Sequence, residues 1–248
     1  VGALVLRGGL NGGSGWNTLT IGDGTGNAYL CMNAYSNGKW AQIDNAYVAF
    51  GTAHGVIAVG TKVSGVDSGT PYINAFITGS AGVTFVGTDG SGLRLYRPQD
   101  YTGGTQVLGG ELMMQNDSTL GTDVVEVSGG ESRGGCVRFL GTSAFVNDFT
   151  LSGFGTGGAA KKGALSFESE TTLSGQVTLT NDAMICAVAN KTGTFSVGPA
   201  VYDKDFYDIT VAEAEHGSVT ASPAPYAAGS QFTATAQADD GYAFVGWE

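Results

Sequence analysis

The sequence predicts an all-β protein, a parallel β-solenoid followed by a small separate β module. Short runs of alternating apolar residues recur about every 10 to 15 residues, as in half-buried strands, and no segment has the spacing of an amphipathic helix. Glycines separate these runs. Since 42 of the 248 residues are glycine while 42% are hydrophobic, the glycine marks corners between strands rather than disorder.

The charge composition narrows the range of partners. Only 13% of the residues are charged, and 22 acids against 11 bases give a net charge of −11. Without a basic patch to neutralise phosphates, nucleic acid and anionic membrane surfaces are poor partners. No stretch approaches the roughly 18 consecutive apolar residues of a transmembrane helix. This composition suits a secreted β protein.

The part of the chain before residue 87 contains several short strands, each with one apolar face. We expect strands at 4–6, 19–21, 30–32, 46–50, 57–59, 73–77 and 83–85. Two or three of them make one coil of roughly 20 to 30 residues, the range of a solenoid repeat. A β-sandwich gives similar spacing. The solenoid is favoured because two-residue hairpin signals are few, namely Asp23-Gly24, Asn37-Gly38 and Asp89-Gly90.

The clearest strand pattern runs from Gly87 to Gly130. Four apolar runs, at 93–95, 105–107, 112–114 and 125–127, are separated there by paired or nearly paired glycines. The pattern continues with strands expected at 137–139, 149–151, 165–167, 177–179, 185–187 and 195–197. Alternation along these strands predicts core positions at Leu112, Val125, Val127, Val137 and Phe139.

Several residues of this stretch carry a family resemblance. They are Tyr101, Gly103, Gly104, Thr105, Gly109, Gly110, Leu112, Leu120 and Gly121. In this order they resemble the autotransporter-associated β-strand repeat, which is found in passenger domains of secreted bacterial surface proteins. The resemblance implies that residues 1–203 form a right-handed parallel β-helix, displayed outside the cell in association with the outer membrane. It implies no reaction.

A second resemblance lies in residues 204–248, which follow a charged connector without glycine. The segments Gly217-Ser-Val-Thr220, Gly229-Ser-Gln-Phe-Thr-Ala-Thr-Ala236 and Gly241-Tyr-Ala-Phe-Val-Gly-Trp247 resemble the divergent internalin-type B-repeat of bacterial surface proteins. That repeat normally continues past the tryptophan, so we expect this copy to be truncated. The chain also opens inside an apolar run, and we expect a longer precursor.

No residue pattern indicates a metal or cofactor site. The nonapeptide from Gly12 to Thr20 resembles a calcium-binding glycine-rich repeat, but Asn17 replaces its aspartate and no second copy follows. Four aspartates are expected in turns, where they can bond local amides: Asp23, Asp44, Asp67 and Asp89. Three cysteines lack zinc-ligand spacing and are expected to be unpaired thiols: Cys31, Cys136 and Cys186. We expect neither a metal nor a cofactor.

The sequence also shows no catalytic constellation. Most acids are scattered singly, and Glu168 and Glu170 are expected on the solvated face of one strand. The Lys161-Lys162 pair is expected in a solvated turn, and His54 and His216 in separate turns. Polysaccharide-cleaving β-helices need clustered carboxylates, or a base beside an acid cluster. We therefore expect that this chain is not an enzyme.

Exposed aromatic residues are the best candidates for binding, because a sugar ring or a partner protein can stack on them. The foremost candidates are Trp16, Tyr35 and Trp40. Tyr29, Tyr47 and Tyr96 share this capacity, although nothing in the sequence groups them into one patch. The expected partner is a glycan or a protein of a host or cell surface.

Two functions remain open at this point. The first is a non-catalytic scaffold or adhesin segment, a β-helical stalk that presents a binding surface or spaces other domains from the cell. The second is an accessory region of a larger polysaccharide lyase or hydrolase whose catalytic domain lies elsewhere. The flanking precursor sequence discriminates between them, since a membrane barrel or sorting tail indicates the first and a catalytic domain the second.

Overall fold

The fold is given by a computed structural model, which describes residues 2–22, 24–33, 40–60, 70–116, 118–129, 134–141, 144–156, 162–196, 201–202, 206–207, 216–221, 226–227 and 234–243. The chain divides into two compact units, Val1–Tyr202 and Asp203–Glu248. Strands are the only regular elements among the described residues, as the alternating apolar runs predict.

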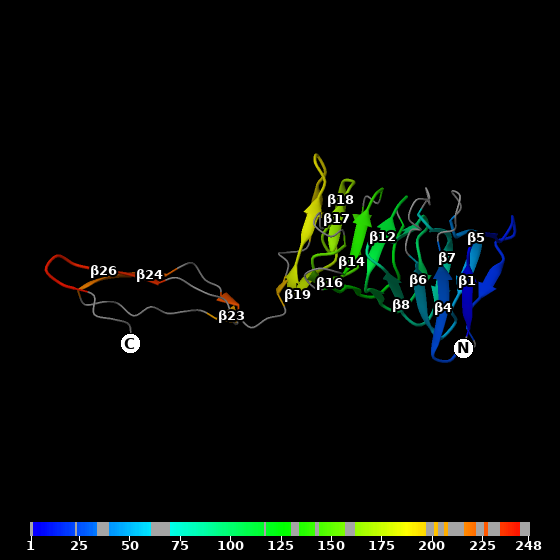
Figure 1. The fold of residues 1–248 in the computed structure, drawn as a ribbon, viewed down its shortest axis with the longest axis horizontal. Helices are drawn as coiled ribbons and strands as arrows, with labels where there is room; N and C mark the ends of the chain where they lie inside the picture. Colours follow the sequence, from blue (N-terminus) through cyan, green and yellow to red (C-terminus); the bar gives the residue numbers. More distant parts are fainter. Residues whose placement is uncertain are drawn as a thin grey trace. The chain divides into compact units, whose positions relative to one another are not determined.

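The described residues of the first unit form three sheets (Figure 1). The first sheet consists of β1 (Ala3–Leu6), β4 (Asn27–Met32), β6 (His54–Val59), β8 (Val83–Gly87), β11 (Thr105–Val107), β13 (Val125–Val127), β16 (Phe149–Gly153), β19 (Val177–Ala183) and β22 (Val201–Tyr202). The second consists of β2 (Gly9–Asn11), β5 (Gln42–Ala49), β7 (Tyr72–Gly79), β9 (Gly92–Leu95), β12 (Gly110–Met114), β14 (Gly135–Phe139), β17 (Leu165–Phe167) and β20 (Ile185–Ala187), with β3 (Thr18–Thr20) beside β5 and β10 (Asp100–Tyr101) beside β7. The third consists of β15 (Ala144–Phe145), β18 (Thr171–Leu173) and β21 (Gly193–Phe195).

Along the chain, each first-sheet strand from β1 to β19 is followed by one or two strands of the second sheet, and most strands pair with their counterpart one circuit further along the chain. A circuit here means one passage of the chain through both sheets. Gly92 pairs with Glu111, whereas Gly9 pairs with Gln42, so the circuits differ in length and take 19 to 33 residues. All strand pairs described within residues 1–202 are parallel. Hairpin-linked sandwich strands pair antiparallel, so the parallel pairing rules out the sandwich alternative.

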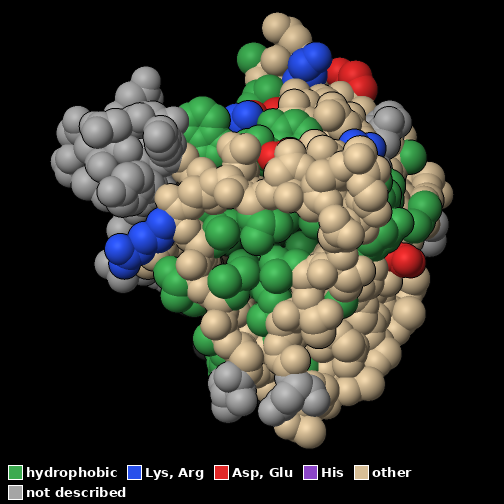
Figure 2. All heavy atoms as spheres, turned by 90° about the vertical axis from the view of Figure 1, so that its right-hand side faces the viewer, with side chains coloured by type: hydrophobic (Ala, Val, Ile, Leu, Met, Phe, Trp, Pro, Cys, Tyr) green, Lys and Arg blue, Asp and Glu red, His purple; other side chains and the backbone are tan. Residues whose placement is uncertain are grey.

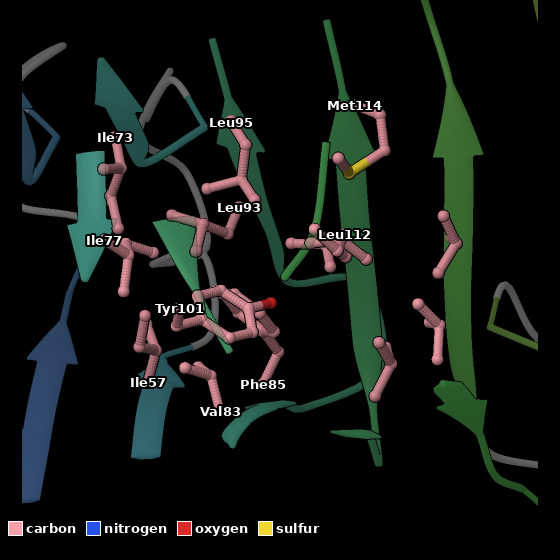
Figure 3. Packing of buried hydrophobic residues seen from close by; sticks show 14 of the residues in the cluster. Ile57, Ile73, Ile77, Val83, Phe85, Leu93, Leu95, Tyr101, Leu112 and Met114 are labelled. Carbon is pink, nitrogen blue, oxygen red and sulfur yellow. The ribbon is translucent and has the colours of Figure 1, made fainter. Parts of the chain in front are cut away.

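The core lies between the sheets and is built from columns of paired inward residues. One column contains Leu93, Leu112, Val137 and Leu165, which are paired from strand to strand. Figure 3 shows Leu93, Leu112 and other labelled side chains pointing into this interior. The five predicted core residues are at most 1% exposed, which confirms their assignment: Leu112, Val125, Val127, Val137 and Phe139.

Phenylalanines dominate the C-terminal part of this core. The rings of Phe139 and Phe167 occupy paired positions and stack with centroids 5.2 Å apart. Phe145 and Phe149 approach the Phe139 ring edge-on, at 5.4 and 6.3 Å. Edge-to-face and offset-stacked rings add to the stabilisation that their burial already provides.

Tyr101 explains part of the repeat motif in the middle of the chain. Its side chain is 0% exposed, and its hydroxyl is 2.6 Å from Oγ1 of Thr105. Burial raises the pKa of Tyr101 to about 12, although hydrogen bonds to Thr105 and Gly121 oppose the shift. A Cβ on Gly121 would lie 2.4 Å from the Tyr101 ring, so only glycine fits there.

The other motif residues lie at corners or in the core. Gly110 has a φ of +72°, in the left-handed region that favours glycine. Close contact with the backbone of a neighbouring circuit is shared by Gly103, Gly104 and Gly109. Leu112 and Leu120 are buried. The motif therefore combines tight corners with inward apolar positions.

The N-terminal face of the first unit carries partly buried apolar side chains. Figure 2 shows hydrophobic side chains gathered near the centre of this face. The partly buried residues that pack against the core from the first circuit are Leu4, Leu6, Leu10 and Leu19.

The second unit is paired differently. β24 (Gly217–Ala221) and β26 (Ala234–Ala238) are antiparallel, as are the short strands β23 (Phe206–Tyr207) and β25 (Tyr226–Ala227). His216 precedes β24, and its ring stacks on Tyr242 with centroids 4.0 Å apart. Trp247, the last residue of the B-repeat pattern, lies outside the described residues.

Phe139→Ala tests the core. We expect the free energy of unfolding to fall by about 3 to 5 kcal/mol, because the change removes a fully buried ring and leaves a cavity. Denaturant titration measures the loss, with Val146→Ala as the control, since Val146 is 72% exposed. A loss below about 1 kcal/mol for Phe139→Ala would contradict the inward assignment.

Gly121→Ala tests the contact beneath Tyr101. We expect a loss of about 1 to 3 kcal/mol, because the added methyl overlaps the buried ring. The control is Gly8→Ala, since a Cβ on Gly8 meets nothing within 4 Å. Thermal and denaturant unfolding of both variants give the comparison, and equal stability of the two would show that the corner accommodates a side chain.

Candidate ligand-binding surface

Two strands of the second sheet place polar and aromatic side chains on its outer face. The pairing of β5 with β7 aligns Asp44 with Asn74 and Tyr47 with Phe76. The residues that alternate with Asn74 and Phe76 along β7 are 0% exposed and point inward: Ile73, Ala75 and Ile77. Side chains of successive circuits are therefore neighbours on this face although they are 29 or 30 residues apart.

A bulge in β5 allows this arrangement. The register shifts between Asp44 and Tyr47, and Asn45 within the shift has a φ of +50°. Asparagine tolerates this left-handed conformation better than most residues. The extra residue leaves both Asp44 and Tyr47 on the outer face, although three positions separate them.

The turn between β2 and β3 positions Trp16. The Asn17 side-chain amide donates a hydrogen bond of 2.7 Å to the Gly12 carbonyl, and the Gly13 N–H donates one of 2.8 Å to Oδ1 of Asn11. An ionised aspartate at 17 has no N–H to donate. The asparagine that breaks the calcium-repeat pattern thus closes this turn, and Trp16 adopts a φ of +52° next to it.

Trp16, Tyr47 and Phe76 form one group, here called the aromatic cluster. The rings of Tyr47 and Phe76 stack with centroids 5.6 Å apart, and the Trp16 ring lies 5.4 Å from Phe76 and 6.2 Å from Tyr47. Arg97 lies over the Trp16 ring, with Cζ 5.3 Å from the centroid. Tyr47 is the most exposed member, at 39%.

Asp44 is the centre of a hydrogen-bond network beside the cluster. Its Oδ2 accepts bonds from Nε2 of Gln42 at 3.1 Å and from the Tyr72 hydroxyl at 3.2 Å. Its Oδ1 accepts a bond of 3.1 Å from Nδ2 of Asn74, whose Oδ1 in turn accepts one of 2.9 Å from Nε of Arg97. The network therefore joins three circuits and fixes the orientation of the carboxylate.

The segment after β9 is held in place by Gln99. This side chain is buried, accepts a hydrogen bond of 2.8 Å from the Ile77 N–H, and donates one to the Arg97 carbonyl. Arg97 and its neighbour Tyr96 are thereby set against β7. The rings of Tyr96 and Tyr72 meet edge to face at 5.6 Å.

These residues surround a hollow of about 560 Å³. Its lining consists of Asp44, Tyr72, Asn74, Tyr96, Arg97, Pro98 and Asn116. Partial burial, the Asp44 charge and its hydrogen bond, and the neighbouring Tyr96 raise the pKa of Tyr72. Tyr72 therefore keeps its proton at neutral pH, and both tyrosines offer a ring face and a hydroxyl to a ligand.

The structure distributes the predicted binding aromatics unevenly. Trp16 is part of the aromatic cluster. Trp40 precedes β5 and is half-buried, and its buried indole N–H has no hydrogen-bond partner among the described residues. Tyr35 lies outside the described residues. The sequence analysis placed Asp44 in a turn, which is wrong, because Asp44 lies within β5.

Other site residues were missed altogether. Tyr72, Asn74 and Phe76 alternate with inward isoleucine and alanine, so alternation along β7 assigns them to the outer face. Alternation could not assign Arg97 to this face, because Arg97 follows the end of β9. Its contact with Trp16, which is 81 residues away in the sequence, depends on the tertiary structure.

A second polar cluster lies further along the same outer face. Arg138 of β14 forms ion pairs with Glu111 of β12 and with Glu168, the latter at 2.6 Å. Lys162, at 2.5 Å, and Thr156, at 3.2 Å, also bond Oε1 of Glu111, whose side chain is only 7% exposed.

This cluster bears on two expectations. Lys162 lies in the loop between β16 and β17, as expected, but its ammonium group also binds Glu111, which the sequence did not indicate; Lys161 lies outside the described residues. Glu168 and Glu170 do not share a strand face, because β17 ends at Phe167, and Glu168 pairs with Arg138 while Glu170 is exposed. Burial alone would raise the pKa of Glu111, but Lys162 and Arg138 outweigh it and hold the pKa below its usual value.

The structure contradicts the expectation for His54 but agrees with the expectation that the cysteines are unpaired. His54 begins β6 and is not a turn residue, and its Nε2 lies 2.7 Å from Oγ1 of Thr84. Cys136 is on the outer face, as alternation predicts, yet it is 0% exposed, and burial raises its pKa to about 12. Cys31 and Cys186 are free thiols, as is Cys136.

The described residues contain no group of three His, Cys, Asp or Glu side chains placed to hold a metal ion. They also contain no helix long and apolar enough to cross a membrane.

Comparison with known proteins gives a match in the C-terminal part of the chain. Residues 207–248 match the family model of the divergent InlB B-repeat domain, which supports the resemblance noted in that segment. The comparison with curated proteins found no match, and neither did the comparison with solved structures.

The Glu111 cluster predicts acid sensitivity. Because the folded protein holds the pKa of Glu111 below its ordinary 4.5, its ion pairs contribute stability above that pH, and this contribution is lost as the pH falls through the folded value. We expect Glu111→Gln to lose about 2 kcal/mol at neutral pH, because Lys162 loses its carboxylate partner and Arg138 keeps only Glu168, and to flatten the pH dependence.

Denaturant titrations between about pH 3 and pH 7 measure this effect. Glu170→Gln is the matched control, since Glu170 is exposed and should leave the profile unchanged. A Glu111→Gln profile as steep as that of the unmodified protein would contradict this role for the cluster.

Proposed function

We propose that this chain is a non-catalytic segment of an exported bacterial surface protein. The observation that carries the proposal is the B-repeat match at residues 207–248, because repeats of this kind are typical of bacterial surface proteins. In this proposal the chain is an adhesin or spacer segment, located outside the cell and associated with the outer membrane.

The proposal assigns residues 1–202 the role of a presenting stalk. Parallel strands that return to the same two sheets in every circuit support its interpretation as a right-handed parallel β-helix of the autotransporter-associated type. Such a stack displays one outer residue from each circuit in an ordered row. In this proposal the stalk presents its outer residues to a glycan or to a protein of a host or cell surface.

The absence of catalysis is also part of the proposal. Glu111 and Glu168 both form ion pairs with Arg138, and Lys162 also binds Glu111, so cations neutralise both carboxylates. A glycosidase needs one carboxyl that can release a proton onto the substrate. The near-complete burial of Glu111 instead fits a structural ion-pair network that binds Lys162 to strand β12.

Two measurements test this proposal. Antibody labelling of intact and permeabilised bacteria that produce the protein should give equal signals, and labelling only after permeabilisation would contradict export. The purified chain, incubated with a polysaccharide panel with and without calcium, should release neither reducing ends nor unsaturated products. Turnover that a single acid substitution abolishes would contradict the non-catalytic assignment.

A further inference from the structure

We propose that the hollow around Asp44 and the aromatic cluster beside it form a binding site for a neutral oligosaccharide. This inference rests on the proposed function, a module that acts by presenting a binding surface. It goes further by naming the site and the chemical class of its ligand.

The size and shape of the hollow indicate a small ligand. Its volume of about 560 Å³ falls within the range of about 300 to 1,000 Å³ that small-molecule sites occupy. A stable protein partner covers about 800 Å² of surface on each side, around a largely apolar centre. The hollow offers no such centre, because four of its seven lining side chains are charged or amides.

The chemistry of the lining indicates a sugar. A pyranose ring has apolar C–H faces and a rim of hydroxyl groups, so it needs ring faces and planar hydrogen-bonding groups side by side. Tyr72 and Tyr96 supply half-buried rings, while Asp44, Arg97 and Asn116 supply an acceptor, a donor and an amide. The aromatic cluster extends the apolar surface towards Tyr47, which is 39% exposed.

The groups of the hollow are also held in place before a ligand arrives. Asp44 is fixed by Gln42, Tyr72 and Asn74, and Arg97 by Asn74 and the Trp16 ring. Preorganised side chains lose little conformational entropy on binding. The site therefore needs no rearrangement to accept hydroxyl groups.

The charge distribution favours a neutral sugar over an acidic one. One carboxylate and one guanidinium line the hollow, so their charges balance locally. The chain as a whole carries −11, which repels a polyanionic glycan at long range.

Binding of the full chain to polysaccharides tests the site. The probes are a β-glucan, a xylan, a mannan and a galactan, with polygalacturonate as the acidic comparator, in affinity gel electrophoresis. An oligosaccharide of the retained polymer then gives the affinity by calorimetric titration. We expect at least one neutral polymer to retard the protein.

The variants Tyr96→Ala, Tyr47→Ala and Asp44→Asn should each weaken binding about tenfold or more. Their matched controls are Tyr29→Ala and Glu126→Gln, which change an aromatic and an acidic residue on strands β4 and β13 of the other sheet. Both controls should bind within about twofold of the unmodified protein. Circular dichroism and thermal midpoints establish that every variant is folded.

Three outcomes would overturn the inference. They are retention by no neutral polymer, retention by polygalacturonate alone, and unchanged affinity of all three folded site variants. Capture of a protein ligand in place of any glycan, with loss in the same variants, would also assign the hollow to another class of partner. None of these outcomes bears on the non-catalytic proposal, which only turnover of a polysaccharide contradicts.

Discussion

The register between successive circuits is the constraint on which the rest of the structure depends. In a parallel pair each residue faces its counterpart one circuit away, about 4.8 Å distant, so the neighbours of a side chain are set by the length of the circuit. Tyr101 shows the consequence. Its ring occupies the space where a side chain at position 121 would lie, so the residue at that position is glycine.

The same register builds the outer face of the second sheet. It aligns Asp44 with Asn74 and brings Glu111 within reach of Arg138, although neither pair is close in sequence. A partly buried carboxylate needs donors or cations around it. Around Asp44 the donors are neutral amides and a tyrosine hydroxyl, which leaves an open hollow, whereas around Glu111 they include two cations that close over it.

Much of the fold follows from the sequence because strand alternation is a local property. The spacing of Val125 and Val127, or of Val137 and Phe139, predicts their inward direction without knowledge of which strands pair. The divergent B-repeat could be identified in the same way, because its residue order is distinctive over a short segment.

The candidate site could be predicted only in part, because it depends on which circuits are neighbours and by how many residues they differ. Circuits of unequal length prevent a fixed period from aligning Trp16 with Phe76 or Arg97. The bulge at Asn45 adds one residue to β5 between Asp44 and Tyr47. Strict alternation would therefore place these two side chains on opposite faces of the sheet, although both lie on the outer face. Alternation does place Tyr72, Asn74 and Phe76 outward, and this signal was available from the sequence.

The proposed sugar-binding hollow depends on parallel register, which assembles it from three circuits on the outer face of the second sheet. A crystal structure of the full chain with a bound neutral oligosaccharide tests it most directly. We expect a sugar ring against Tyr72 and Tyr96, with its hydroxyl groups bonded to Asp44 or Arg97. A ligand bound elsewhere, or a register that separates Asp44 from Asn74, would contradict it.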